Sequence, residues 1–179
     1  MKTNLLLPIL ILATVTFSQS KMITKTGRII FEASVPLFEE ITACSEDASC
    51  VFNAKTGEIE SLVMVKGFRF KIPMMEDHFN DHYIESRRYP KAKFKGRVIN
   101  FDVKAITTEA KEFMMKGTLH LHGKSKEFLI PAKIRRTENG IEIMSSFNLN
   151  TEDFSIAIPA IIRKKVSNRV KLYTVFTVL

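Results

Sequence analysis

The sequence predicts an all-β protein built as a closed antiparallel barrel of eight strands. Apolar and polar residues alternate with period two along most of the chain, which is typical of strands with two distinct faces. About eight or nine such segments are joined by short turns rich in Gly, Asn and Lys, as an antiparallel meander requires. Eight antiparallel strands can close into a barrel, and closure leaves no exposed sheet edge.

The first twenty residues have the pattern of a secretory signal peptide. Lys2 gives a positive start, residues 5–15 are almost entirely apolar, and small residues follow as far as Ser20. The apolar run of eleven residues is too short to span a bilayer, which takes about 20. We therefore expect residues 1–20 to be removed during export. Residues 21–179 would then form a single domain that is periplasmic or secreted.

Alternation assigns the strands in chain order. The apolar residues that share a strand face, and that we expect to point into the barrel, are Ile29, Phe31, Ala33 and Val35; Phe113, Met115, Leu119 and Leu121; Phe128, Ile130, Ala132 and Ile134; Ile141, Ile143, Phe147 and Leu149; and Val170, Leu172, Phe176 and Val178. Further strands are expected near Val51 and over residues 58–66, 68–72 and 91–103. The alternation changes phase at Lys66-Gly67 and at Val98-Ile99, which predicts β-bulges.

Two short segments have a helical pattern. Residues 74–88 place Met75, Phe79 and Tyr83 on one stripe, and Pro90 then ends the helical geometry. Residues 159–167 begin with a proline, which suits the first turn of a helix. We expect one or two short helices to flank the mouth of the barrel.

The charge of the chain narrows the class of partner. A formal net charge of +8 fits an anionic partner such as a phosphorylated lipid, or a transient contact with a membrane surface. The chain has no Trp and three Tyr, so aromatic platforms on which bases could stack are sparse. We expect no nucleic-acid partner.

Cys44 and Cys50 have two interpretations. Export would place them in a compartment where a disulfide persists, and closing the short loop between them would stabilise the fold by about 2 kcal/mol. The alternative is a pair of buried thiols. Neither a CxxC redox pair nor a Cys/His zinc pattern is present in the sequence.

Familiar catalytic motifs are absent from the sequence. It contains no GxSxG nucleophile motif and no glycine-rich phosphate loop. His78, His82 and Glu85 share one face of the first predicted helix and could hold zinc, although the HExxH order is missing. His120 and His122 project to the same side of a strand, which favours a solvated or rim-lining face.

These histidines leave two alternatives to a binding protein open. A hydrophobe-processing enzyme would need His78, His120 and His122 to converge on one point in a pocket. A secreted metal-binding or interaction protein would use His78, His82 and Glu85. The leading expectation is a protein without catalytic activity, metal or cofactor.

Phe and Met are unusually abundant, with 14 and 8 residues, many at positions expected to point inward. They could form a solid core. Methionine also gives an interior adaptable surfaces that suit a flexible apolar ligand. A narrow barrel lined in this way would favour a linear hydrocarbon, which gains about 0.8 kcal/mol per buried methylene.

The segment MMEDHFNDHYIESRRYPKAKFKG, residues 74–96, resembles the signature region of the YceI-like polyisoprenoid-binding family. The resemblance continues through FMMKGTLHLHGKSKEFLIPAKI and through NLNTEDFSIAIPAIIRKKVSNRVKLYTVFTVL at the C-terminus. The residues that match the family motif are His78, Phe79, Asn80, Tyr89, Pro90 and Phe94. His82 lies outside that motif, and the two cysteines are a departure from the family pattern.

This resemblance implies a lipocalin-like, eight-stranded antiparallel barrel that is exported to the periplasm. It also implies a long isoprenoid ligand, such as a quinone tail or a polyprenyl phosphate, bound by a monomer or homodimer. The residues that we expect to line the ligand are Phe70, Met75, Phe79, Tyr83, Phe94, Met115, Phe128, Phe147, Phe154 and Ile156. Lys or Arg at the rim would meet a polar head group.

Overall fold

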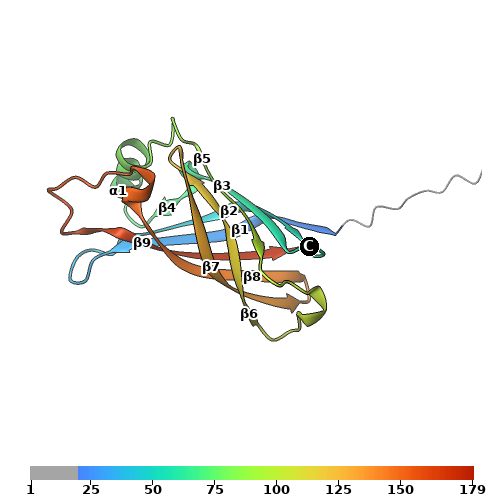
Figure 1. Cartoon of the computed structure of the whole chain (residues 1–179). Helices are drawn as coiled ribbons and strands as arrows, with labels where there is room; N and C mark the ends of the chain where they lie inside the picture. The colour runs from blue at the N-terminus through green and yellow to red at the C-terminus, as the bar shows by residue number, and fades with distance from the viewer. Residues whose placement is uncertain (1–19) are drawn as a thin grey trace, which may run out of the picture.

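In the computed structural model, which describes residues 20–179, the chain forms a closed antiparallel barrel of eight strands (Figure 1). The strands are β1 (Lys21–Ser34), β2 (Thr42–Asn53), β3 (Glu58–Met64), β5 (Lys91–Val98), β6 (Lys111–Leu121), β7 (Lys124–Thr137), β8 (Gly140–Asn150) and β9 (Val166–Val178). Their order is β1-β9-β8-β7-β6-β5-β3-β2, and pairing of β1 with β2 closes the barrel. The predicted fold class is confirmed. The predicted signal peptide lies outside the described residues, apart from Ser20.

Short helical elements lie at the ends of the strands. They are the 3₁₀ turn η1 (Val65–Gly67), the helix α1 (Pro73–His78), the π-helical turn η2 (Phe79–Tyr83), and the 3₁₀ turns η3 (Val103–Ala105) and η4 (Thr151–Phe154). A two-residue strand, β4 (Arg69–Phe70), pairs with β2. Among residues 20–179, no helix is long and apolar enough to cross a bilayer. We call the end of the barrel at which α1 lies the mouth.

Most of the predicted inward positions are confirmed. In β7, Ile130, Ala132 and Ile134 are buried, whereas Pro131 and Lys133 between them are exposed. Cross-strand register then brings inward residues of neighbouring strands together. Met115 of β6 lies opposite Ile130, and Ile134 lies opposite Ile143 of β8.

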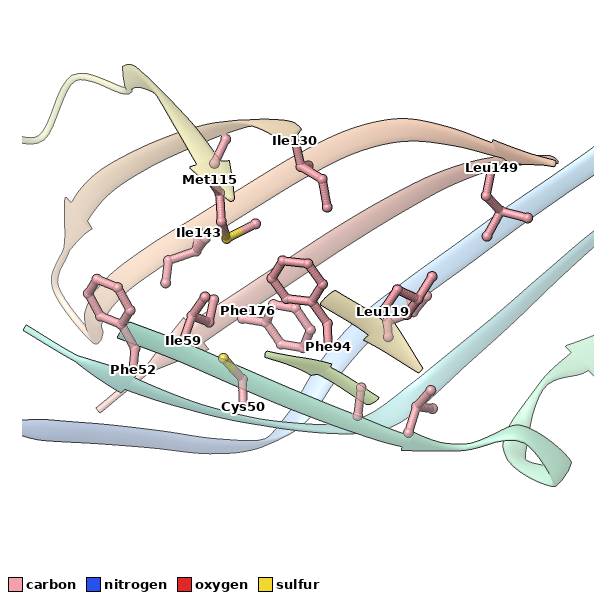
Figure 2. Packing of buried hydrophobic residues seen from close by; sticks show 14 of the residues in the cluster. Cys50, Phe52, Ile59, Phe94, Met115, Leu119, Ile130, Ile143, Leu149 and Phe176 are labelled. Atoms are coloured by element: carbon pink, nitrogen blue, oxygen red, sulfur yellow. The ribbon is translucent and has the colours of Figure 1, made fainter. Parts of the chain in front are cut away.

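The half of the barrel away from α1 is filled by its own side chains. Figure 2 shows Phe52, Phe94, Met115 and Phe176, which come from four different strands, among the buried residues that fill the interior of the barrel. A glycine makes room for one of these rings, because a Cβ at Gly117 would lie 2.5 Å from Cζ of Phe94. This half of the barrel is therefore a close-packed core.

The irregularities of the sheet do not lie where the sequence predicted bulges. At the first predicted site, β3 ends at Met64 and the chain turns into η1. At the second, β5 ends at Val98. The register shifts occur instead between β1 and β2, on either side of Gly27, and between β1 and β9, after Glu32. The apolar pattern changed phase at the two predicted sites because the strands ended there.

Of the two interpretations of Cys44 and Cys50, the disulfide is wrong, because both cysteines are free. They lie six positions apart in β2, which at ~3.3 Å per residue separates their Cα atoms by about 20 Å. A disulfide needs less than about 7 Å. The register shift in β2 also reverses the strand face between them, so Cys50 is buried while Cys44 lies beside the Arg28 side chain.

We expect thiol reagents to modify Cys44 and spare Cys50 in the folded protein. Burial raises the pKa of the Cys50 thiol to about 12, so its reactive thiolate is scarce at pH 8. Intact mass after alkylation should show a single adduct on the folded protein and a second adduct only in denaturant. Two adducts on the folded protein would contradict this burial.

The helices are shorter than the sequence predicted. The first predicted helix, residues 74–88, becomes α1 and η2 and ends at Tyr83. The second, residues 159–167, is a series of turns, with hydrogen bonds from Ile162 N to Pro159 O and from Lys165 N to Ile162 O. So short a segment is a poor helix in isolation, and Val166 already pairs with Ser34 of β1 as β9 begins.

Candidate ligand-binding cavity

The mouth half of the barrel encloses a cavity of about 300 Å³. Inward side chains of β1, β3, β5, β6, β8 and β9 form its wall, and α1, η2 and the segments flanking them cover it. The residues that line it are Ile29, Phe31, Ala33, Ile41, Val63, Val65, Phe68, Phe70, Met75, His78, Phe79, Tyr83, Ile84, Ala92, Leu119, Leu121, Leu149, Thr151, Ile156, Ile158, Ile162, Val166, Ser167, Val170 and Leu172. All but four are apolar residues.

Phe94 is not itself a lining residue but lies directly beneath the cavity, and we call its ring the floor. Its neighbours on the same strand face and across the ladder, Ala92 and Leu119, both line the cavity. The Phe94 ring turns away from the mouth, since its Cε1 and Cζ lie against Gly96 and Gly117. The ring therefore lies between the lining residues Ala92 and Leu119 and the close-packed core.

Four phenylalanines close the cavity at the mouth. Phe31 of β1 lies 5.2 Å from Phe68, 5.6 Å from Phe70 and 5.3 Å from Phe79, between ring centroids. Phe70 and Phe79 are themselves 5.2 Å apart. These tilted and edge-on contacts are the favoured aromatic geometries. They attach the segment of residues 65–83, which we call the lid, to the barrel wall.

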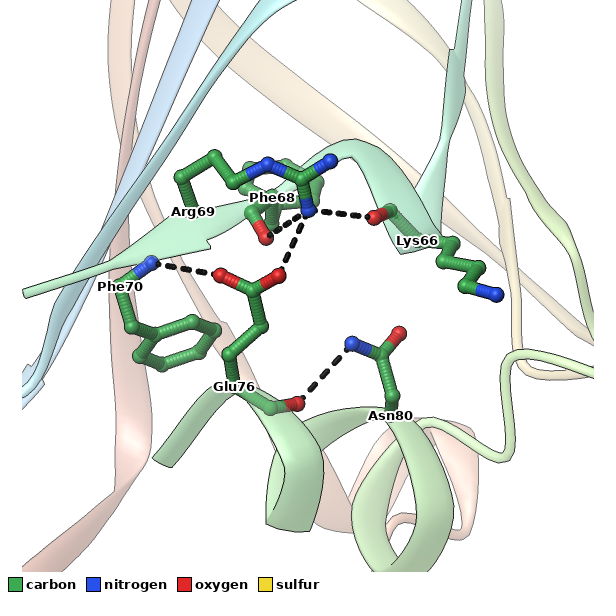
Figure 3. A network of polar contacts seen from close by, with 6 residues as sticks. All are labelled: Lys66, Phe68, Arg69, Phe70, Glu76 and Asn80. Atoms are coloured by element: carbon green, nitrogen blue, oxygen red, sulfur yellow. Dashed lines mark hydrogen bonds and ion pairs between the residues drawn. The ribbon is translucent and has the colours of Figure 1, made fainter. Parts of the chain in front are cut away.

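A polar network holds α1 onto the rest of the lid (Figure 3). Glu76 of α1 accepts hydrogen bonds from Arg69 Nη1 at 2.6 Å and from the Phe70 backbone N–H at 3.2 Å. Arg69 Nη1 also donates to the Lys66 carbonyl at 3.1 Å. One turn further along, Asn80 Nδ2 donates to the Glu76 carbonyl at 2.9 Å. The network fixes which face of α1 and η2 meets the cavity.

A second polar link joins three loops beside the cavity. His122 Nε2 lies 2.8 Å from Glu85 Oε2, and His122 Nδ1 lies 2.9 Å from the Phe154 carbonyl oxygen. A carbonyl and an ionised carboxylate both accept hydrogen bonds, so the two contacts coexist when both ring nitrogens carry hydrogen. The Tyr89 ring packs edge-on against His122, 4.4 Å between centroids. We call this link the His122 latch.

The latch also explains two unusual backbone conformations. Glu85 has φ +47° and His122 has φ +49°, both in the left-handed region that side chains disfavour. Because this conformation breaks the alternation after β6, His122 turns inward and is buried, whereas His120 stays exposed and contacts Ser125. The prediction that these two histidines share a strand face was therefore wrong.

Replacing His122 should destabilise the fold. We expect His122→Ala to lower the free energy of unfolding by about 1–3 kcal/mol, because it removes a buried donor from Phe154 and the partner of Glu85. His120→Ala is the matched control and should change stability by less than about 0.5 kcal/mol. Urea unfolding of both variants measures the difference. Equal losses would show that the latch contributes nothing.

Half of the predicted ligand-lining residues lie at the cavity. Phe70, Met75, Phe79, Tyr83 and Ile156 line it. Phe94 is its floor, and Met115 lies deeper in the core. The remaining three residues, Phe128, Phe147 and Phe154, lie outside the cavity lining.

These three phenylalanines pack on one another instead. Phe128 lies 5.6 Å from Phe147 and 6.3 Å from Phe154, between ring centroids. Pairing of β7 with β8 extends only from Thr137 to Ala132, and η4 contributes Phe154 where the two strands separate. The three rings thus fill an opening between strands, which the alternation pattern could not reveal.

Sequence reasoning missed part of the lining. Leu119, Leu121 and Phe31 were placed on inward faces but were not assigned to a ligand, because alternation does not show where the core stops. Ile162 was missed because residues 159–167 were interpreted as a helix, and Ile158 because no strand was predicted just before them. The alternation of Ile156 and Ile158 was the signal that could have identified an extended wall.

The histidine hypotheses find no geometric support in residues 20–179. The rings of His78 and His82 lie 5.6 Å apart in a tilted arrangement, but Glu85 bonds to His122 instead. No group of three His, Cys, Asp or Glu side chains in this part of the chain could hold a metal ion. His120 points to the exterior and His122 is held in the latch, so neither converges with His78 on one point.

A comparison with protein families shows to which family this barrel belongs. The model of the YceI-like domain matches residues 13–178. The chain belongs to the YceI-like family. In this YceI-like chain, the motif residues build the lid and the floor. Asn80 bonds to α1, Tyr89 packs on His122, and the Phe94 ring lies beneath the cavity against Gly96 and Gly117.

Solved structures share the fold of this YceI-like chain at low sequence identity. A polyisoprenoid-binding domain from Saccharophagus degradans is 17% identical, has a TM-score of 0.74, and the match covers 87% of this chain and 95% of that one. BcnA from Burkholderia cenocepacia is 15% identical, with a TM-score of 0.67 and coverage of 84% and 96%. The Campylobacter jejuni YceI protein is 17% identical, with a TM-score of 0.56 and coverage of 74% and 81%. No curated protein sequence compared with the chain matches it.

Proposed function

We propose that this protein binds one isoprenoid-type lipid by enclosing part of its tail in the mouth-half cavity. The observation that carries the proposal is an unfilled, almost wholly apolar cavity inside a barrel of the YceI-like family. The relative from Saccharophagus degradans, which is described as a polyisoprenoid-binding domain, supports the class of ligand. Binding requires no reaction, and we propose no catalytic activity.

The size of the cavity limits how much of a tail it can enclose. A volume of about 300 Å³ lies at the lower end of the range for small-molecule sites. A water molecule takes up ~30 Å³ in the liquid, and a tail carbon needs a similar volume. The cavity therefore holds about ten carbons, or two isoprene units. A longer tail must extend past the lid toward solvent or another surface.

The tail, rather than the head group, should dominate affinity. Ten enclosed carbons at about 0.8 kcal/mol each give roughly 8 kcal/mol gross, before the cost of association. An exposed salt bridge to a head group contributes about 1 kcal/mol or less.

A series of prenols with one to five isoprene units tests this proposal. On delipidated protein, we expect affinity to rise more than tenfold from one unit to two and to level off by the third. Straight-chain alcohols with the same numbers of carbons are the matched control, and similar affinities for them would widen the ligand class to lipids in general. Affinity that does not depend on tail length would overturn the proposal.

We also propose that the protein is exported and acts in the periplasm or outside the cell. The support is the sequence of residues 1–20, with Lys2, the apolar run over residues 5–15 and the small residues that follow. Export would bring the cavity close to membranes that contain isoprenoid lipids. Cell fractionation tests the proposal, and recovery of the protein in the cytoplasm would overturn it.

A further inference from the structure

We infer that the mouth of this barrel docks on an anionic lipid bilayer through two protruding loops. One is the β1–β2 loop, residues 35–41. The other, residues 155–165, lies between η4 and β9, and we call it the basic loop. Figure 1 shows both loops projecting from the end of the barrel at which α1 lies.

Both loops present large apolar side chains to solvent. Ile161 in the basic loop is 90% exposed, and Leu37 in the β1–β2 loop is fully exposed with its neighbour Phe38 about half exposed. Leu37 is held at φ +71°, a conformation that a leucine rarely adopts. Met74 at the start of α1 adds a further exposed apolar side chain at this end. Side chains of this kind can enter the boundary between lipid head groups and acyl chains.

The charge of the basic loop selects the type of surface. Arg163, Lys164 and Lys165 begin two positions after Ile161, and all three are exposed. Among residues 20–179, none of these three cations forms an ion pair with a carboxylate within 4.0 Å. The chain has no Asp or Glu from residue 154 to its end. Glu39 and Glu40 in the other loop offset only part of this positive charge.

The basic loop is continuous with the cavity wall. Ile158 and Ile162 line the cavity, whereas Ile161 between them points to solvent. A bilayer that receives Ile161 would therefore lie directly against the mouth. A lipid tail could then pass between bilayer and cavity with little exposure to water. This favours a bilayer over a protein partner or a second copy of the chain as the occupant of the surface.

Vesicle binding tests the inference without using an isoprenoid lipid, so its outcome is independent of the ligand in the cavity. The chain has no Trp, so Ile161→Trp creates a single fluorescent reporter at the tip of the basic loop. With vesicles of phosphatidylglycerol and phosphatidylethanolamine, its emission should shift to the blue, and brominated acyl chains should quench it. Vesicles of phosphatidylcholine alone should give neither change.

Charge variants of the otherwise native protein identify the surface in a cosedimentation assay with the same vesicles. The triple variant Arg163→Ser, Lys164→Ser, Lys165→Ser should bind anionic vesicles about 100-fold more weakly, which corresponds to about fivefold per cation. The matched control, Lys55→Ser, Lys104→Ser, Arg136→Ser, removes the same charge from exposed positions beyond the opposite half of the barrel. It should bind almost as the unmodified protein does.

Three results would overturn the inference. The first is equal vesicle binding by the triple variant and the unmodified protein. The second is an equal loss in the matched control, which would indicate a general effect of net charge. The third is a dimer in solution that Ile161→Ser dissociates, because the exposed patch would then be an interface between copies of this chain.

Discussion

Filling the cavity with a side chain of the protein should abolish tail binding and stabilise the fold at the same time. Ala33 of β1 is buried and lines the cavity, so the ring in Ala33→Phe would occupy the space proposed for the ligand. Displacing about four methylenes at ~0.8 kcal/mol each should weaken binding by at least about 100-fold. Titration of delipidated protein with geraniol measures the loss.

The accompanying stability change distinguishes cavity filling from damage to the fold. Burial of the new ring should raise the free energy of unfolding by about 1.5–3 kcal/mol, because the site is open and apolar. Ala48→Phe is the matched control, since Ala48 is fully buried and lies outside the cavity lining. Overpacking there should destabilise the protein by about 1–3 kcal/mol. Retained geraniol binding in Ala33→Phe would show that the ligand lies elsewhere.

Removing the floor should lengthen the tail that the protein accepts. Phe94→Ala would open the space between the cavity and Gly96 and Gly117, where the ring now lies. We expect the prenol series to level off about one isoprene unit later, with a gain of tenfold or more for the longer tail, because ~0.8 kcal/mol is gained per additional methylene. The cost in stability should be about 3–5 kcal/mol.

A second phenylalanine controls for this loss of stability. Phe52 is fully buried and packs against Phe101 at 5.2 Å, but it is not part of the cavity lining. Phe52→Ala should lose a similar 3–5 kcal/mol without any change in preferred tail length. Phe94→Leu, which opens less space at a smaller cost, keeps the experiment interpretable if Phe94→Ala does not fold. An unchanged length preference in a folded Phe94 variant would show that Phe94 does not limit the cavity.

Alternation was sufficient to predict the barrel, because an antiparallel strand with one buried face has a period of two whatever its neighbours are. It correctly placed Ile130, Ala132 and Ile134 inside. It could not separate core from cavity, since Met115 and Leu119 have the same pattern in β6 and only Leu119 borders the cavity. That difference depends on the position of Phe94, which pairs with Leu119 and lies beneath the cavity.

Local breaks in regularity were harder to predict than the fold. The register shift in β2 reverses the strand face between Cys44 and Cys50, and no turn residue marks it in the sequence. The left-handed conformation of His122 likewise turns one histidine inward while His120 stays outside. Both features depend on partners distant in the sequence, namely β1 for the bulge and Glu85 for the latch.

Native mass spectrometry of the protein purified from its own host, followed by organic extraction, tests the enclosed tail most directly. We predict a chain that begins near residues 19–21 and carries one terpenoid lipid, which is absent when Ala33→Phe is purified in the same way. Two results together would contradict the proposal. They are a protein without bound lipid under conditions that preserve lipid adducts, and an extract without terpenoid.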